Sequence, residues 1–115
     1  MSKRIKVSEI SHFEATKCLT IELPWKDSVL DILVVRYLDD NFAAYLNKCP
    51  HTGVNLNWQP NQCYDFSEQH LVCSLHGALF QPEDGKCIYG PCLGQSLTPI
   101  ILEIEAGSIF VRLAS

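Results

Sequence analysis

The chain has 115 residues, 47% of them hydrophobic, which allows one compact domain but no second core of ordinary size. Its formal net charge is -4 and its nine lysines and arginines are scattered, which argues against nucleic acid as a partner. No apolar run approaches the roughly 20 residues that cross a bilayer. After Lys3 and Arg4, polar and apolar residues alternate, so no secretory hydrophobic region can be drawn. We therefore expect a soluble cytoplasmic protein.

Short alternating or β-branched runs dominate the chain and predict strands. In chain order, these predicted strands cover residues 4–7, 18–23, 29–38, 42–46, 71–73, 100–105 and 108–113. Turn-forming residues separate neighbouring runs at the spacing of hairpins, at residues 38–41, 82–85 and 105–108. The best helical candidate is a short turn over residues 8–13, with Ser8 as its N-cap. The pattern predicts an all-β fold, an antiparallel sandwich or barrel.

The strand pattern weakens in the second half of the chain, where Pro, Gly, Asn, Gln and Cys crowd together. We treat residues 1–115 as one domain in which residues 47–97 form a loop-rich subdomain carried by the β scaffold. Functional residues concentrate on loops that a rigid framework positions. The chemistry is therefore expected between Cys49 and Cys92.

Two Cys/His pairs stand in this subdomain, Cys49 with His51 and Cys73 with His76. These residue types suit either zinc or an iron-sulfur cluster, so composition alone does not choose the metal. A Cys2His2 zinc finger pairs Cys with Cys and His with His, whereas each pair here is mixed. Mixed pairs suit a two-iron site in which one iron carries both thiolates and the other both imidazoles. Because the cytosol keeps thiols reduced, metal binding explains at least some of the six cysteines better than a disulfide framework.

The two loops resemble those of a known family. Cys-Pro-His-Thr-Gly at 49–53 and Cys-Ser-Leu-His-Gly-Ala-Leu-Phe at 73–80 look like the two cluster-binding loops of Rieske ferredoxins. The resemblance extends to Asp84-Gly85 and to Gly90-Pro91, the latter matching the proline loop that covers the cluster in this family. It spans about residues 4–113.

This resemblance implies a Rieske-type antiparallel β-sandwich with a loop-rich cluster-binding subdomain and one Rieske-type 2Fe-2S cluster. In the family's pattern, Cys49 and Cys73 bind the inner iron, and His51 and His76 bind the outer iron through Nδ1. The Nε2 edges of the two imidazoles then lie at the protein surface. Those edges are the expected electron port.

Several positions depart from the high-potential respiratory members of the family. Those proteins join the two loops by a disulfide, whereas Val54 and Ser74 or Leu75 stand at the matching places here. They also carry a serine and a tyrosine that donate hydrogen bonds to cluster sulfurs, and here these positions hold Ala78 and Phe80. Because such hydrogen bonds stabilise the extra electron, their loss predicts a low potential, about -150 mV as an order of magnitude.

The resemblance implies a soluble, monomeric one-electron carrier that is not itself an enzyme. It would take electrons from an NAD(P)H-dependent flavoprotein reductase and pass them to a terminal oxygenase. Two alternatives stay open: a small Rieske-like subunit of a nitrite reductase or other multi-subunit oxidoreductase, and a binding module stapled by zinc. The chain alone cannot be an oxygenase, because that chemistry needs a mononuclear iron held by two histidines and a carboxylate, and only His12 and His70 remain.

The other cysteines and histidines are expected to lie outside the metal site. Cys87 and Cys92 flank the proline loop, but the four-ligand set is complete without them. Cys18 and Cys63 are interpreted as small hydrophobic residues in or near the core. His12 and His70 have no paired cysteine at ligand spacing.

Overall fold

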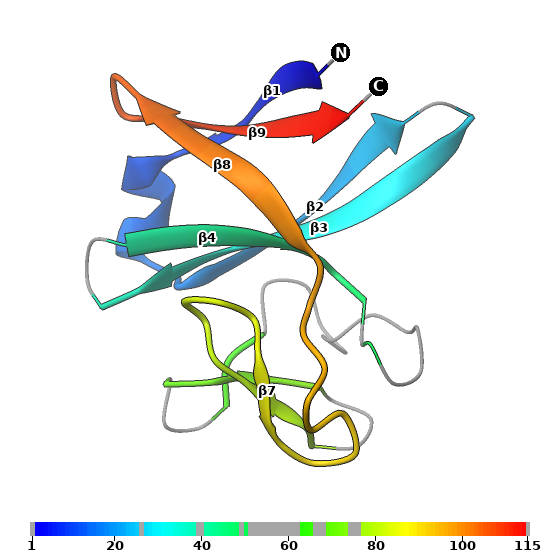
Figure 1. Ribbon diagram of the computed structural model, residues 1–115. Helices are drawn as coiled ribbons and strands as arrows, with labels where there is room; N and C mark the ends of the chain where they lie inside the picture. The colour runs from blue at the N-terminus through cyan, green and yellow to red at the C-terminus, as the bar shows by residue number, and fades with distance from the viewer. Residues whose placement is uncertain are drawn as a thin grey trace.

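The computed structural model describes residues 2–25, 27–38, 41–48, 50, 63–65, 69–73 and 77–114. The elements, in chain order, are β1 (Ser2–Glu9), η1 (Ile10–Glu14), β2 (Cys18–Trp25), β3 (Ser28–Tyr37), β4 (Asn41–Leu46), β5 (Leu71–Val72), β6 (Leu79–Phe80), β7 (Cys87–Tyr89), β8 (Pro99–Glu105) and β9 (Ser108–Ala114) (Figure 1). The only helix among them is η1, a 3-10 turn, and no helix within the described ranges is long and apolar enough to span a membrane.

The long strands form one antiparallel sheet in the order β1-β9-β8-β4-β3-β2. Strand β8 pairs with β9 along most of its length but meets β4 only at its start, where Pro99 lies opposite Tyr45 and Ile100 opposite Ala44. In Figure 1, β8 crosses from the layer of β1 and β9 to the layer of β2, β3 and β4. The six strands therefore make the predicted antiparallel sandwich, which we call the scaffold.

The remaining strands form a second antiparallel sheet, β5-β6-β7, below the scaffold in Figure 1. Strands β6 and β7 are short and were not among the predicted strands. With the loops around them, they form the loop-rich part of the chain. We call the described residues 63–65, 69–73 and 77–97 the lower unit.

Strand β3 is buried on both faces, because each face covers a different hydrophobic cluster. Its consecutive residues Ile32, Leu33, Val34 and Val35 are all buried. Ile32 and Val34 pack inside the scaffold, while Leu33 and Val35 pack against the lower unit. Alternate side chains of a strand point to opposite faces, so an unbroken apolar run marks a strand with cover on both sides. The lower unit therefore rests on the outer face of β3.

All seven predicted strands are present, each within two residues of its predicted ends. The hairpin predicted at residues 105–108 is confirmed, with positive φ at Ala106 (52°) and Gly107 (81°), as in a two-residue turn of the I′ type. The N-cap prediction is wrong. Ser8 lies in β1 opposite Ile109, and η1 begins after Glu9 with no side-chain cap. Pairing with β9 holds Ser8 in the strand, so it cannot turn to cap the helix.

Candidate metal centre

Cys73 follows directly after β5 and is fully buried. Its backbone N–H donates to the carbonyl of Ala78 at 2.8 Å, and its own carbonyl accepts from the N–H of Gly77 at 2.8 Å. Gly77 has a φ of +69°, a backbone conformation that residues other than glycine rarely adopt. These two hydrogen bonds hold the backbone of Cys73 close to that of Gly77 and Ala78.

Of the predicted ligands, the structure describes Cys73. Cys49, His51 and His76 lie outside the described residues, as do Val54, Ser74 and Leu75. The described residues contain no group of three or more His, Cys, Asp or Glu side chains that could hold a metal. The convergence of Cys49, His51, Cys73 and His76 on one cluster therefore stays a prediction.

Ala78 lies immediately before β6 and Phe80 lies within it, and both side chains are fully buried. Phe80 lies opposite Leu71 of β5 on one side and Cys87 of β7 on the other. Both side chains belong to the same buried hydrophobic cluster as Cys73. Neither an alanine methyl nor a phenylalanine ring carries a hydroxyl that could donate a hydrogen bond there.

The proline loop lies directly against this segment. A Cβ built on Gly90 would come within 2.8 Å of Cα of Ala78, so only glycine allows this approach. The loop is closed by the N–H of Leu93, which donates to the carbonyl of Gly90 at 3.2 Å, and by the N–H of Gln95, which donates to that of Cys92 at 2.8 Å. Gly90 of the proline loop therefore packs directly against the backbone of Ala78.

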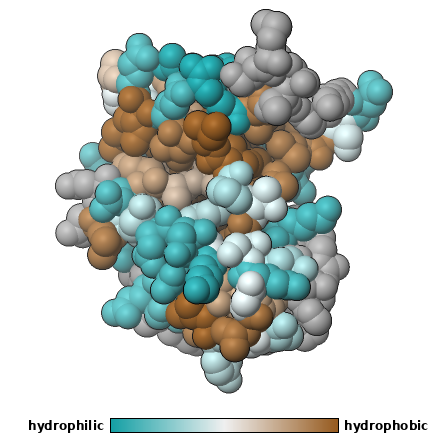
Figure 2. Space-filling model, in the orientation of Figure 1, coloured by the Kyte–Doolittle hydropathy of each residue, from teal (hydrophilic) through white to brown (hydrophobic). Residues whose placement is uncertain are grey.

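The outer surface of the same loop is apolar. Tyr89 is 65% exposed and Leu93 is 67% exposed, with Ile88 and Pro91 also exposed between and beside them. The chain carries no Asp, Glu, Lys or Arg from residue 87 to residue 96. Figure 2 shows brown, hydrophobic side chains at this lower end of the molecule, where Figure 1 draws β7. We call Ile88, Tyr89, Pro91 and Leu93 the apolar tip.

Two tyrosines fasten the lower unit to the scaffold. The hydroxyl of Tyr45 in β4 donates to the carbonyl of Pro82 at 2.6 Å, and that of Tyr64 donates to the carbonyl of Arg36 in β3 at 2.8 Å. Burial, helped by the charge of Asp84, raises the pKa of Tyr45 above its ordinary range. Its hydroxyl therefore stays protonated and remains a donor at any physiological pH.

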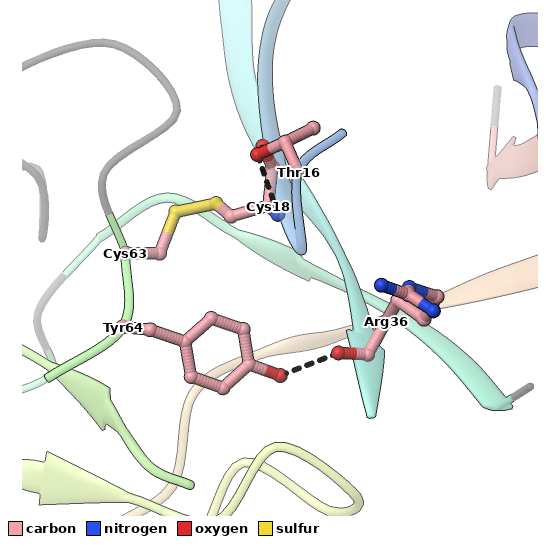
Figure 3. The surroundings of a disulfide bond; sticks show 5 residues. All are labelled: Thr16, Cys18, Arg36, Cys63 and Tyr64. Atoms are coloured by element: carbon pink, nitrogen blue, oxygen red, sulfur yellow. Dashed lines mark hydrogen bonds between the residues drawn. A yellow bond between two sulfur atoms is a disulfide. The ribbon is translucent and has the colours of Figure 1, made fainter. Parts of the chain in front are cut away.

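Cys18 and Cys63 form a disulfide, which joins the start of β2 to the lower unit (Figure 3). Their burial is confirmed, at 2% and 1% exposure, but the interpretation of both as mere small hydrophobic residues is wrong. The two cysteines are 45 residues apart in the chain. No local pattern reveals such a pair, because only the docking of the lower unit on β3 brings them together.

Three of the remaining Cys and His residues have contacts of their own in the structure. Cys87 is a buried thiol whose Sγ donates to the carbonyl of Tyr89 at 3.3 Å. His70 stands 4.0 Å from a carboxylate oxygen of Asp65, and the exposed His12 packs edge-on to the ring of Phe13.

Comparison with protein families places most of the chain in one of them. The family model described as the Rieske [2Fe-2S] domain matches residues 3–106. A search of curated proteins found no match.

Solved structures show the same fold. The ferredoxin of carbazole 1,9a-dioxygenase from Nocardioides aromaticivorans IC177 is 18% identical, with a TM-score of 0.69 over 95% of this chain and 96% of that one. A chain from a complex of reduced oxygenase and oxidized ferredoxin in carbazole 1,9a-dioxygenase is 20% identical, with a TM-score of 0.71 over 94% and 91%. The apo form of the quaternary ammonium Rieske monooxygenase CntA is 20% identical, with a TM-score of 0.73 over 95% of this chain but only 32% of that one. The fold thus occurs both as nearly a whole chain and as part of a larger one.

Proposed function

This chain belongs to the Rieske [2Fe-2S] domain family and carries one Rieske-type 2Fe-2S cluster in an electron-transfer role, and from that premise we propose a specific place for it. It is a soluble carrier that takes single electrons from an NAD(P)H-dependent flavoprotein reductase and passes them to a terminal oxygenase. The observation that carries this proposal is the apolar tip, an exposed and uncharged surface beside the segment that contains Cys73. Such a surface suits brief docking to a redox partner.

We propose Cys49, His51, Cys73 and His76 as the ligands of the cluster. Two thiolates and two neutral imidazoles are the donor set that a Rieske centre requires. The burial of Cys73 fits an inner, water-excluded thiolate, and its two backbone hydrogen bonds to Gly77 and Ala78 fit a rigid support for a ligand. The bound cluster supplies one-electron chemistry; the chain holds it, keeps water from the inner side and presents the outer side to a partner.

A low potential, about -150 mV, is part of the proposal. Its support is the burial of Ala78 and Phe80, two side chains without donors, in the packing behind Cys73. A low potential suits a carrier that stands between a flavin and an oxygenase. We further propose that residues 1–115 act as one domain, monomeric and cytoplasmic, with a cluster-binding subdomain over residues 47–97.

The test combines spectroscopy with reconstituted electron transfer. The purified holoprotein, reduced by NADH and a flavoprotein reductase, should give a Rieske-type electron spin resonance signal, and it should sustain turnover of a terminal Rieske oxygenase. Iron and zinc are measured on the same sample. A colourless protein that contains zinc would sink the carrier function and favour the zinc-stapled module.

Docking is tested by a matched pair of substitutions. Leu93→Glu places a charge on the apolar tip, and Ile101→Glu places one on scaffold strand β8 at nearly the same exposure, 67% against 65%. Because a buried, unpaired charge is costly at an interface, we expect Leu93→Glu to slow electron delivery about tenfold and Ile101→Glu to leave it unchanged. Equal effects of the two variants would contradict docking at the tip.

One observation favours a second candidate. The match covers only 32% of the CntA chain, so the same fold also works inside a larger oxidoreductase. In that case this chain would serve as a fixed subunit, such as the small subunit of a nitrite reductase. Tight co-purification with a large enzyme subunit, together with failure to reduce a diffusible acceptor, would support this alternative.

A further inference from the structure

Among the described residues, the Cys18–Cys63 disulfide is the one covalent link between the scaffold and the lower unit besides the polypeptide backbone. Cys18 opens β2, an edge strand of the scaffold, and Cys63 begins the segment 63–65 that leads toward β5. Figure 3 shows the bond beside a second attachment, in which the Tyr64 hydroxyl donates to the carbonyl of Arg36. Two consecutive residues, Cys63 and Tyr64, therefore fasten the lower unit to β2 and β3.

The fastened segment is hydrogen-bonded to the strand that ends at Cys73. The carbonyl of Cys63 accepts from the N–H of Val72 at 2.8 Å, and Tyr64 forms a bridge with Leu71. Val72 is the residue immediately before Cys73. The disulfide is therefore connected to the backbone of Cys73 through one backbone hydrogen bond, from Val72 to Cys63, and one peptide bond. Movement of Cys63 away from β2 would therefore displace Val72 and, with it, the backbone of Cys73.

The bond is shielded from solvent. Both cysteines are almost fully buried within the same hydrophobic cluster as Leu33, Tyr45 and Phe80. A cavity of about 420 Å³ lies nearby and is lined by Lys17 and Tyr64, the chain neighbours of the two cysteines, but its lining does not include either cysteine. Reduction of a disulfide requires a thiolate to reach one of the sulfurs. A reductant in solution has no such access while the lower unit stays docked.

We propose that Cys18–Cys63 is a protected covalent staple that fixes the Cys73 segment on the scaffold and persists under reducing conditions as long as the chain is folded. It forms when the two thiols exchange with a small-molecule disulfide, R–S–S–R. The Sγ–Sγ bond forms, the S–S bond of the oxidant breaks, and the two protons and two electrons leave on two R–SH molecules. The consequence for the cluster rests on the ligand role proposed for Cys73, whereas the existence and protection of the bond do not.

The bond itself is tested by thiol mapping of the holoprotein. The protein is denatured anaerobically with a chelator, alkylated without reductant and digested. Two of the six cysteines should escape alkylation, and a linked peptide pair should contain Cys18 and Cys63. A first incubation of the folded protein with millimolar dithiothreitol should leave this result unchanged, whereas dithiothreitol in denaturant should expose all six. Six alkylated cysteines without reductant would overturn the staple, and ready reduction in the folded state would overturn its protection.

The effect on the cluster is tested with Cys18→Ser/Cys63→Ser. The variant's visible absorbance is followed after addition of an iron chelator, with Cys87→Ser as the control for a hydroxyl in place of a buried thiol. We expect cluster loss to be about tenfold faster in the double variant than in the control. Equal rates of cluster loss would show that the disulfide does not fix the segment that contains Cys73. If the double variant fails to fold, chelation of wild-type protein reduced in mild denaturant and returned to buffer under anaerobic dithiothreitol gives the same comparison.

These outcomes are separate from those that test the carrier function. A protein that keeps the staple and the cluster but delivers no electrons to an oxygenase would contradict the proposed function alone. A protein that delivers electrons yet shows six free thiols would contradict the staple alone.

Discussion

The Tyr45 hydroxyl lies 2.6 Å from the carbonyl oxygen of Pro82, which places a residue of scaffold strand β4 in direct hydrogen bond with the turn that precedes β7. The ring of the same tyrosine packs so closely on Gly85 that a Cβ there would approach its Cε1 to 2.8 Å. Gly85 has a φ of +76°, so both its conformation and its contact require glycine. Gly85 of the Asp84-Gly85 pair thus has a packing reason, because the absence of a side chain lets this turn pack against the ring of Tyr45.

Tyr45→Phe should destabilise the holoprotein by about 1–2 kcal/mol. The substitution keeps the ring but leaves the buried carbonyl of Pro82 without its donor. Urea unfolding followed by tryptophan fluorescence measures the loss, with Tyr89→Phe as the control, because the ring of Tyr89 is largely exposed. An equal midpoint for the two variants would mean that water replaces the Tyr45 donor at no cost.

The scaffold could be predicted from the sequence because its strands bury one or both faces in long runs. The run from Ile32 to Val35 is a strand in the structure, and the turn at Ala106 and Gly107 is placed as its residues indicate. Strands β6 and β7 have only two and three residues, so no alternation can develop within them. Their signal was instead the flanking glycines, Gly77 before β6 and Gly90 after β7.

The candidate site was predicted from two mixed Cys/His pairs and from the resemblance of their loops to those of Rieske ferredoxins. The structure adds contacts that neither source contains. Cys73 follows directly after β5, which agrees with its place at the start of the second predicted ligand loop. Cys49, His51 and His76 lie outside the described residues. The link from Cys18 to Cys63 could not be predicted, because it depends on the tertiary docking of two units rather than on any periodicity.

Gly90→Ala should damage the proline loop far more than Gly94→Ala. Both residues have positive φ, +102° and +92°, so both substitutions carry a similar backbone strain. Only at Gly90 does the new methyl collide with backbone, at 2.8 Å from Cα of Ala78, whereas a Cβ on Gly94 meets nothing within 4 Å. We expect an additional loss of about 1–3 kcal/mol for Gly90→Ala and faster release of iron to a chelator. Identical losses for the two variants would show that the loop moves away freely.

Glu103 should contribute a pH-dependent part of the scaffold's stability. A hydrogen bond from Arg112, opposed by partial desolvation and aided by the charges of Arg112 and Arg4, lowers the pKa of Glu103 below its ordinary 4.5. A lowered folded-state pKa means that this contribution is present above about pH 4.5 and is lost as the pH falls through the lowered value. The Tm difference between wild type and Glu103→Gln should therefore shrink on going from pH 7 to pH 3. A difference that stays constant over this range would exclude the ionised carboxylate as its source.

Ala78→Ser combined with Phe80→Tyr should raise the midpoint potential of the cluster. Both side chains are buried in the same hydrophobic cluster as Cys73, so a hydroxyl at either position lies in the water-excluded surroundings of this proposed ligand. A hydroxyl that donates to a cluster sulfur stabilises the additional electron of the reduced state. Two such bonds, at about 0.7 kcal/mol each, correspond to a rise of about 60 mV for a one-electron couple. Spectroelectrochemical titration measures the midpoint, and an unchanged oxidised spectrum shows that the cluster is intact.

The control is Phe110→Tyr, which adds the same hydroxyl to a ring of the scaffold. Phe110 lies in β9, and its ring is covered by the guanidinium of Arg4 in β1. Its midpoint should match that of wild type, because the new oxygen lies outside the lower unit. If the Ala78 and Phe80 variant shows no rise beyond that control, missing hydrogen bonds are not what sets the potential. The cause would then have to be sought in the solvent exposure or the charge around the proposed ligands His51 and His76, because exposure and charge also govern how readily a Rieske centre accepts an electron.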